Sequence, residues 1–595
     1  MKKLRKILSA VLVALMVFSA IPTLSANAYS YGQEDGFAYY VTDEGTAVFT
    51  AYRGEEIHIV IPETLGGYPV TDISGSGSME WGENVKSITL PSTVAEIHWG
   101  AFWGLGIEEI TLNEGLKKIG ESAFAECEKL ESIVLPDSLE SIGNGAFELC
   151  SKLKSINIPE KVIVIPDSLF NSCDFESFEI PAHIRQIGNC VFSGNKNFKE
   201  ITVARDNLYY SAVDGVLMNK EQTEILLYPR AKADNTYKVA NTVKKIGQYA
   251  FAGCSSLDEI TLPEGLELIE KNAFTGCNFE YLSIPDTVTD IEASAFVNCD
   301  NLEVVTLGDG LISISGGLFA NCDNLETVCV GSSVKNLGDY AFENCRSLRE
   351  VTLPDGLERI GGRAFINCTN LEYLVMPNTV KELGTEAFMD CKSLINVTLS
   401  EKLSVIEQNC FKGCVELRYM VIPDSVTEIH RGAFYGCVDL RSVEFGSKVN
   451  YIADVAFGDC QSLTRITIPD NVTYLSQYSI GYNTYINCHM VTEYSLCPWV
   501  IIYANKDSAA IAYAKEKGLM IGILDGDVSP YSRGDVDGDG KISVKDATLI
   551  QKYLANLVTL EQIQENAADV AGTPEIRIND ATTIQKYVAG YDIKI

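Results

Sequence analysis

A repeat with a fixed period runs through most of the chain. The phrase AFENCRSLREVTLPDGLERIGGRAFINC contains the shared pattern, and each copy is anchored by a phenylalanine. The anchors are spaced by 22 or 23 residues, except for one interval of 59 residues between Phe192 and Phe251. The anchoring residues are Phe102, Phe124, Phe147, Phe170, Phe192, Phe251, Phe274, Phe296, Phe319, Phe342, Phe365, Phe388, Phe411, Phe434 and Phe457. Such a period is typical of solenoids, in which each repeat buries its apolar face by stacking on its neighbours.

Each repeat contains one stretch with the alternation of a β-strand. In LREVTLP, Leu348, Val351 and Leu353 are expected to be buried, and Pro354 ends the segment because proline cannot donate to a backbone ladder. The following LERIG supplies two more apolar positions, and the Ala-Phe pair with the next cysteine returns the chain to the next coil. We therefore expect a solenoid of the α/β repeat class, with one continuous parallel sheet and short helical or irregular returns.

Most of the 18 cysteines follow the repeat rather than a disulfide framework. Thirteen lie three residues after an anchoring phenylalanine, and we expect them to form a column of small, buried, free thiols that satisfy turn backbone. The thirteen are Cys127, Cys150, Cys173, Cys254, Cys277, Cys299, Cys322, Cys345, Cys368, Cys391, Cys414, Cys437 and Cys460. Occasional disulfides between adjacent coils stay open, above all at the off-register Cys190, Cys329, Cys410, Cys488 and Cys497.

The unit LxxIxLPxxLxxIGxxAFxxCxx resembles the BspA-like bacterial leucine-rich repeats of surface and secreted proteins. The resemblance implies a leucine-rich-repeat solenoid over residues 99–469. Residues 29–98 resemble a strand-rich N-terminal cap with the first repeats, and residues 470–523 a C-terminal cap with a strand and a short helix. Caps are required because an open end would expose the core and an unpaired strand edge.

Three places depart from the regular unit. The long interval carries extra residues at 203–240, whose strand-turn-strand pattern predicts a hairpin that projects from one coil. At Leu105 and Asn195 the cysteine of the unit is absent, so irregular coils are expected there.

The first residues predict export. Lysines and an arginine precede an apolar run from Ile7 to about Ile21, and Ala26-Asn27-Ala28 ends it, which is the pattern of a secretory signal peptide over residues 1–28. No second apolar stretch approaches the length of a membrane span, so we expect a secreted protein without membrane insertion. The formal net charge of −33 argues against a nucleic-acid partner.

A calcium-loop pattern stands near the C-terminus, in GDVDGDGKISVKDATLIQKYLANL. Carboxylates occupy loop positions 1, 3, 5 and 12, and Gly540 occupies position 6, where such a loop turns sharply. The expected Ca²⁺ ligands are Asp535, Asp537, Asp539, the carbonyl of Lys541, Ser543 or its water, and Asp546. A second copy keeps Asp569 and Asp580 at its ends but has lost two carboxylates, and Glu575 is a candidate further ligand. We expect a filled first site and a weak, altered or empty second one.

The doubled loop-helix unit has Asp at position 12 and no helix before the first loop, and in this it resembles a type I dockerin. The match covers residues 534–595, after a linker at 524–533. The resemblance implies a small all-α module with EF-hand-like calcium loops that binds the cohesin domain of a scaffoldin in a cellulosome-like assembly. Carried over by position, the cohesin-binding residues are Val544, Lys545, Gln551, Lys552, Ile578, Asn579, Gln585 and Lys586.

The repeats are better suited to binding than to catalysis. The sequence has no nucleophile-elbow, HExxH or P-loop motif, and its acids recur coil after coil, whereas a catalytic pair should be unique. Outward strand positions late in the solenoid gather tyrosine and arginine, which favours a protein or glycan ligand there. The candidate ligand-binding residues are Tyr281, Tyr373, Arg418, Tyr419, Arg441 and Arg465.

These features predict a secreted, non-catalytic recognition protein that docks onto a scaffold and is accessory to polysaccharide breakdown. Two alternatives stay open. One is a cell-surface adhesin anchored through its dockerin. The other is an unrecognised glycoside hydrolase in the unique segments 29–98, 203–240 or 470–523.

Overall fold

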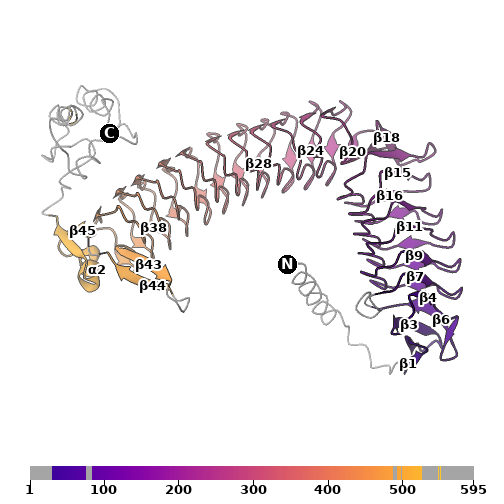
Figure 1. Ribbon diagram of the computed structural model, residues 1–595. Helices are drawn as coiled ribbons and strands as arrows, with labels where there is room; N and C mark the ends of the chain where they lie inside the picture. Colours follow the sequence, from indigo (N-terminus) through magenta and orange to yellow (C-terminus); the bar gives the residue numbers. More distant parts are fainter. Residues whose placement is uncertain are drawn as a thin grey trace. The chain divides into compact units, whose positions relative to one another are not determined.

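The computed structural model describes residues 30–75, 84–486, 492–497 and 499–524, together with Ala547 and Ile550. Backbone contacts divide the chain into two compact units, residues 1–198 with 202–209 and residues 199–201 with 210–595. Both units consist of stacked coils (Figure 1). The repeats therefore form a β-solenoid, as their period predicts.

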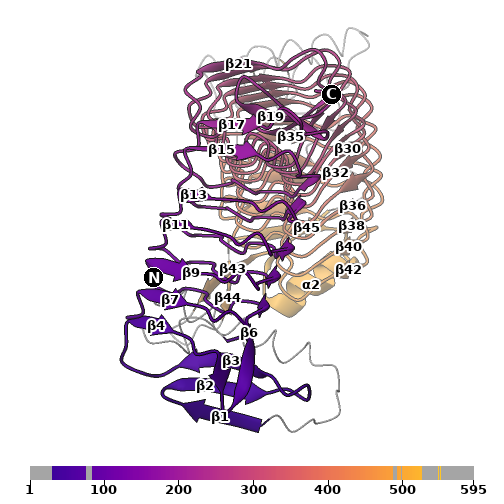
Figure 2. The same ribbon diagram turned by 90° about the vertical axis from the view of Figure 1, so that its right-hand side faces the viewer.

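The first unit begins with an antiparallel sheet that continues into the coils. Strands β1 (Ser30–Glu34), β2 (Phe37–Val41) and β3 (Ala47–Tyr52) pair antiparallel, and β3 then pairs parallel with β6 (Tyr68–Ile73). Figure 2 shows how β4, β7 and β9 follow one another in this unit. The other strands are β4 (His58–Val60), β5 (Thr64–Leu65), β7 (Ser87–Thr89), β8 (Glu96–Ile97), β9 (Glu109–Thr111), β10 (Lys118–Ile119), β11 (Ser132–Ile133), β12 (Ser141–Ile142), β13 (Ser155–Ile156), β14 (Val164–Ile165), β15 (Ser177–Ile180) and β16 (Gln186–Ile187). Strand β17 (Glu200–Val203) contributes residues to both units.

The second unit repeats the same coil, with two short strands in each. The first strands are β21 (Thr236–Lys238), β23 (Glu259–Thr261), β25 (Tyr281–Ser283), β27 (Val304–Thr306), β29 (Thr327–Cys329), β31 (Glu350–Thr352), β33 (Tyr373–Val375), β35 (Asn396–Thr398), β37 (Tyr419–Val421), β39 (Ser442–Glu444) and β41 (Arg465–Thr467). The second strands are β22 (Lys245–Ile246), β24 (Leu268–Ile269), β26 (Asp290–Ile291), β28 (Ser313–Ile314), β30 (Asn336–Leu337), β32 (Arg359–Ile360), β34 (Glu382–Leu383), β36 (Val405–Ile406), β38 (Glu428–Ile429), β40 (Tyr451–Ile452) and β42 (Tyr474–Leu475).

The strand pattern confirms the alternation and corrects the expected single sheet. Leu348 is fully buried, and Val351 and Leu353 are partly buried against the core. The segment LERIG, however, contributes a second strand, so the coils form two series of parallel ladders, each interrupted into short sheets. The returns between them are irregular turns, and none in the described repeats is helical.

The C-terminal end of the second unit contains a hairpin and an αβ closure. Strands β43 (Tyr482–Ile486) and β44 (Thr492–Leu496) pair antiparallel. Strands β45 (Ile501–Ala504) and β46 (Met520–Ile523) extend the ladder of β41 in parallel, and helix α2 (Ala509–Lys517) connects them. Ser508 caps this helix by accepting a hydrogen bond from the Ile511 amide. The predicted strand and short helix are confirmed.

The anchoring phenylalanines stack ring on ring in the core. In the second unit, ten consecutive ring pairs from Tyr228 to Phe457 have centroids 4.9–5.7 Å apart and interplanar angles of 4–23°. Tyr228 lies within the long interval, 23 residues before Phe251, and takes the place of the phenylalanine. The long interval therefore contains a further coil.

The insert contains the predicted hairpin, formed by β18 (Tyr210–Val213) and β19 (Val216–Asn219), and a third strand that joins the solenoid. Together with this third strand, β20 (Glu224–Leu227), they form an antiparallel meander. Strand β20 pairs parallel with β22 and so enters the second ladder. Because Val216, Leu217 and Met218 are buried, the insert packs against the coils rather than standing away from them.

The cysteine column is confirmed as a series of buried free thiols. Each of the thirteen Sγ atoms donates to the carbonyl of the anchoring ring residue one coil earlier, as in Cys345 to Phe319 at 3.1 Å. Burial raises the pKa of the Cys345 thiol to about 12, so the thiol stays protonated. Asn195 keeps the same contact, with its Nδ2 2.7 Å from the Phe170 carbonyl, so its coil is not irregular there. Among the off-register cysteines, Cys190, Cys329, Cys410 and Cys497 are free, and Cys488 lies outside the described residues.

Two positions beside each anchoring phenylalanine have a left-handed backbone. From Phe102 to Phe457, the residues two before and two after each anchoring phenylalanine all have positive φ. Many of them are not glycine, and Leu149, with φ 61°, is a bulky example. A left-handed conformation costs an ordinary L-residue about 1–2 kcal/mol, and asparagine tolerates it best after glycine.

The left-handed column gives a stability prediction. Leu149 is 43% exposed, so replacing it removes little buried area. Leu149→Asn is expected to raise the free energy of unfolding by about 1 kcal/mol because the backbone strain is relieved. Urea denaturation of the variant and the parent, followed by circular dichroism, measures the difference. An unchanged or lower urea midpoint would contradict the strain.

Candidate ligand-binding surface

The outward positions of the first strands form a regular surface in the second unit. Where adjacent strands pair, from β25 to β31, from β33 to β35 and from β37 to β39, they do so in parallel register, so that the first residue of one strand lies beside the first residue of the next. We call this set the outer strand column. From β25 to β41 it consists of Tyr281, Val304, Thr327, Glu350, Tyr373, Asn396, Tyr419, Ser442 and Arg465. One side chain per coil is thus presented at the strand spacing of about 4.8 Å.

Tyr373 and Tyr419 lie two coils apart in this column, as the sequence predicts. Tyr373 pairs with Asn396, and β35 is followed by β37, which begins with Tyr419. Tyr373 is 50% exposed, whereas Tyr419 is partly buried and donates its hydroxyl to Glu444 Oε2 at 2.6 Å. The two rings and the amide between them provide flat apolar area with polar groups beside it, which suits a protein or carbohydrate ligand.

The remaining candidate residues lie at different distances from this pair. Arg418 directly precedes Tyr419, and Arg441 and Arg465 lie in the next two coils, where both are exposed. Tyr281 is exposed in the same column, but four coils before Tyr373. Arg418 and Arg441 thus lie within one coil of Tyr419 and Arg465 within two, whereas Tyr281 lies six coils before Tyr419.

Two surface residues escaped the sequence analysis. Val375 and Val421 are the third residues of β33 and β37, and they are 69% and 37% exposed. They lie on the outward face because side chains of a strand alternate with a period of two, and they widen the apolar area beside the tyrosines. That period, counted forward from each tyrosine, was the signal that could have found them.

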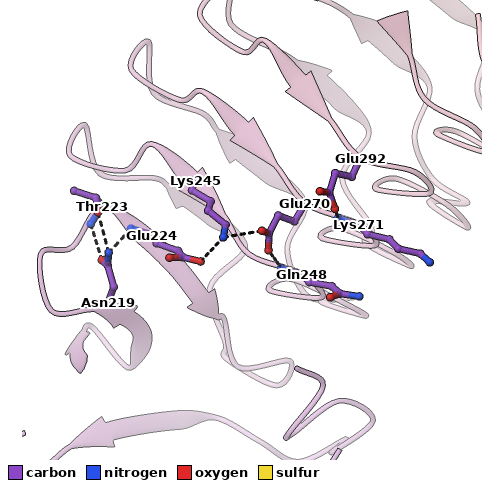
Figure 3. A network of polar contacts seen from close by, with 8 residues as sticks. All are labelled: Asn219, Thr223, Glu224, Lys245, Gln248, Glu270, Lys271 and Glu292. Carbon is purple, nitrogen blue, oxygen red and sulfur yellow. Dashed lines mark hydrogen bonds and ion pairs between the residues drawn. The ribbon is translucent and has the colours of Figure 1, made fainter. Parts of the chain in front are cut away.

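The second strands present charged groups instead. Lys245 Nζ lies 2.9 Å from Glu224 Oε1 and 2.6 Å from Glu270 Oε1, and so bridges the carboxylates of the two flanking coils (Figure 3). Glu270 also accepts a hydrogen bond from the Gln248 amide at 3.0 Å. These contacts connect neighbouring coils, so Glu224, Lys245 and Glu270 have a structural role. The outer strand column therefore remains the candidate binding surface.

A histidine on the same ladder gives a pH-dependent contribution to stability. His430 lies between two carboxylates, with Nδ1 3.1 Å from Glu407 Oε2 and Nε2 3.0 Å from Glu428 Oε2. Burial lowers the pKa of His430, but the hydrogen bonds to Glu428 and Glu407 outweigh this effect and raise it above 6.5. The charged imidazolium therefore stabilises the fold below the unfolded-state pKa, and this contribution is lost as pH rises through the higher folded-state pKa.

The corresponding prediction concerns His430→Gln. The variant is expected to lower the urea midpoint at about pH 5.5 and to change it less at about pH 9, where the histidine is neutral in both states. Urea titrations of both proteins at the two pH values measure this difference. An equal loss at both would contradict the role of the charge.

The calcium and cohesin positions cannot be placed in the fold. The ligands expected between Asp535 and Asp580, and the cohesin-binding residues from Val544 to Lys586, lie outside the described residues. In this segment only Ala547 and Ile550 are described, and both are helical and buried.

Two family models match the chain. The BspA type leucine rich repeat region matches residues 75–199, 234–349, 318–437 and 404–496, more than half of the sequence. The chain belongs to the BspA-type leucine-rich-repeat family. The dockerin type I domain matches residues 533–589. This BspA-type protein therefore carries a domain type that generally binds calcium and cohesin-type partners, and its two domain types indicate an extracellular or cell-surface protein.

The chain is also similar to solved structures of other bacterial proteins. A leucine-rich repeat protein from Eubacterium ventriosum is 24% identical, with 61% of this chain and 95% of that chain covered and a TM-score of 0.46. A leucine rich cell surface protein from Faecalibacterium prausnitzii is 24% identical, with 60% and 96% covered and a TM-score of 0.45. The pneumococcal vaccine antigen PcpA is 20% identical, with 84% and 99% covered and a TM-score of 0.36. No curated protein matches the sequence.

Within the described part of the BspA-type chain, every helix is too short or too polar to cross a bilayer.

Proposed function

We propose that this protein is a secreted recognition component, with repeats that bind a protein or glycan while its dockerin binds a scaffoldin cohesin in a calcium-dependent manner. The observation that carries the proposal is the presence of a dockerin match at residues 533–589 beside repeats that fill most of the chain. Such a protein would bring a target to a polysaccharide-degrading assembly without acting on it.

The proposed domain organisation follows the sequence. The signal peptide covers residues 1–28, the N-terminal cap and first repeats 29–98, and the solenoid 99–469 with its insert at 203–240. The C-terminal cap covers 470–523, the linker 524–533 and the dockerin 534–595. In this arrangement the linker separates the module that binds the ligand from the module that binds the scaffold.

Cohesin binding can be tested on the full chain. The residues proposed to contact the cohesin recur in both halves as Gln551-Lys552 and Gln585-Lys586. If either half can dock, alanine substitutions in one half should not change binding to an immobilised type I cohesin. Substitutions in both halves should abolish that binding. Binding that survives all four substitutions would overturn the assigned surface.

Ligand binding by the repeats has a matched test. Tyr373→Ala and Tyr419→Ala together are expected to weaken binding to the recognised glycan or protein at least tenfold, because they remove the aromatic area of the outer strand column. The ligand is first found by screening the full chain on glycan arrays and fibres. Tyr474→Ala is the control, because Tyr474 is 55% exposed but lies on a second strand. Equal losses in both variants would contradict the proposed site.

The alternatives make different predictions. An adhesin anchored through its dockerin would bind host surfaces and remain at the producing cell. A glycoside hydrolase in 29–98, 203–240 or 470–523 would release reducing sugar from polysaccharide. Structural roles already account for much of these segments, since β18 to β20 enter the second ladder and β45 with α2 extends the first.

A further inference from the structure

Three metal-ligating side chains converge on the second ladder of the first unit. Asp72 of β6 and Glu96 of β8 are paired in parallel register, so their side chains lie side by side on the outward face. His98 follows Glu96 by two residues and returns to that face. One possible ligand atom of each residue lies within 4.8 Å of those of the other two. Strand pairing therefore brings two carboxylates and an imidazole together.

The surrounding contacts orient these groups. Thr71 Oγ1 donates to Asp72 Oδ2 at 2.6 Å, and the other oxygen of Asp72, Oδ1, lies 3.1 Å from His98 Nε2. His98 Nδ1 is 3.9 Å from Glu96 Oε1. All three side chains are partly buried, with 24–40% of their area exposed. The site is therefore fixed by its neighbours and open to solvent on one side.

The charged groups around Asp72 and Glu96 differ from those around Glu224 and Glu270, which lie on the corresponding ladder of the second unit. Around Glu224 and Glu270 an ammonium group lies between the carboxylates, as Figure 3 shows for Lys245. Asp72 and Glu96 instead lie beside the imidazole of His98, and the ammonium of Lys118 comes from the following coil, with Nζ 2.7 Å from Glu96 Oε1. Two adjacent carboxylates repel each other, and a shared cation would remove that repulsion.

A second histidine, His430, also has one carboxylate beside each ring nitrogen, at 3.1 Å and 3.0 Å. At His98 the two contacts are unequal, with Asp72 Oδ1 3.1 Å from Nε2 and Glu96 Oε1 3.9 Å from Nδ1. Among the described residues, the group around His98 alone meets the requirement that three such ligand atoms converge.

We propose that Asp72, Glu96 and His98 bind one divalent transition-metal ion, for which Zn²⁺ is the best-fitting candidate. Zn²⁺ takes imidazole nitrogen and carboxylate oxygen at about 2.0–2.2 Å, and tetrahedral ligands then lie about 3.4 Å apart, a contraction that side-chain rotation can provide. The three protein ligands leave a fourth position for water or for a donor atom from another molecule. The site is independent of the dockerin and of the outer strand column.

The test is calorimetric titration of the full chain with Zn²⁺, in excess Ca²⁺ and without a polyhistidine tag. Wild-type protein is expected to bind one more equivalent of Zn²⁺ than His98→Ala or Asp72→Asn. His430→Ala is the matched control and should keep the wild-type stoichiometry. Circular dichroism verifies that each variant is folded. Equal stoichiometry in wild type and His98→Ala would overturn the proposal, as would loss of the same equivalent in His430→Ala.

A gain-of-affinity variant provides a second test that misfolding cannot imitate. Lys118→Met removes the ammonium that competes for Glu96, so Zn²⁺ should bind about fivefold more tightly. Unchanged or weaker Zn²⁺ binding in this variant would overturn the assigned ligand set.

Discussion

Phe342→Ala is expected to lower the free energy of unfolding by about 3–5 kcal/mol. Phe342 is fully buried, and its ring lies 5.7 Å from that of Phe319 and 5.2 Å from that of Phe365. Truncation removes the apolar area of one ring and leaves a cavity between two others, which the coils cannot close because backbone hydrogen bonds fix their spacing. Urea denaturation followed by circular dichroism measures the loss.

The control for this experiment lies in the same coil. Arg349 has 63% of its side chain exposed and contacts Glu326 only at 4.0 Å, so Arg349→Ala should change stability by no more than about 0.5 kcal/mol. A Phe342→Ala variant within about 1 kcal/mol of the parent would mean that the rings do not form the structural core of the repeat.

Removal of calcium is expected to weaken cohesin binding at least a hundredfold, which corresponds to about 3 kcal/mol. The predicted dockerin is a small module with one small core, so ion binding and folding should be coupled. Asp537→Ala with Asp539→Ala should have the same effect as a chelator, because both carboxylates are predicted ligands of the first loop. Surface plasmon resonance on an immobilised type I cohesin, with and without EGTA, measures both effects.

The degenerate second loop supplies the matched substitution. Thr573 occupies the loop position that corresponds to Asp539 but carries no carboxylate. Thr573→Ala should therefore bind cohesin with wild-type affinity. Undiminished binding in EGTA, or an equal loss in the Thr573 variant, would contradict the prediction that the first loop is the main calcium site.

Structural features that recur in every repeat can be predicted from the sequence, whereas features that depend on single residues cannot. The fixed spacing of phenylalanine and cysteine predicts the stacked core and its thiol column. The second strand was missed because a segment such as Arg359–Ile360 contains one buried residue, too few for any alternation. Tyr228 was missed as an anchor because Leu227-Tyr228 replaces the Ala-Phe pair, although its distance of 23 residues from Phe251 is regular.

Backbone and surface features follow the same rule. Leu149, Tyr340 and Val455 occupy left-handed positions, but their side chains carry no turn signal, so only the coil geometry reveals them. Asp72, Glu96 and His98 come together through strand pairing, and no spacing motif in the sequence connects Asp72 with the other two. The tyrosines of the outer strand column were found because they recur at whole multiples of the repeat.

The stack of phenylalanine rings also affects how the number of repeats in such a gene can change. Every coil offers its neighbours the same ring above and below, so excision of residues 320–342 would bring Phe319 directly onto Phe365. Unequal recombination between repeats could thus lengthen or shorten the protein by whole coils while both ends stay intact. The extent of the surface available to a target would then be set by copy number rather than by the invention of new folds.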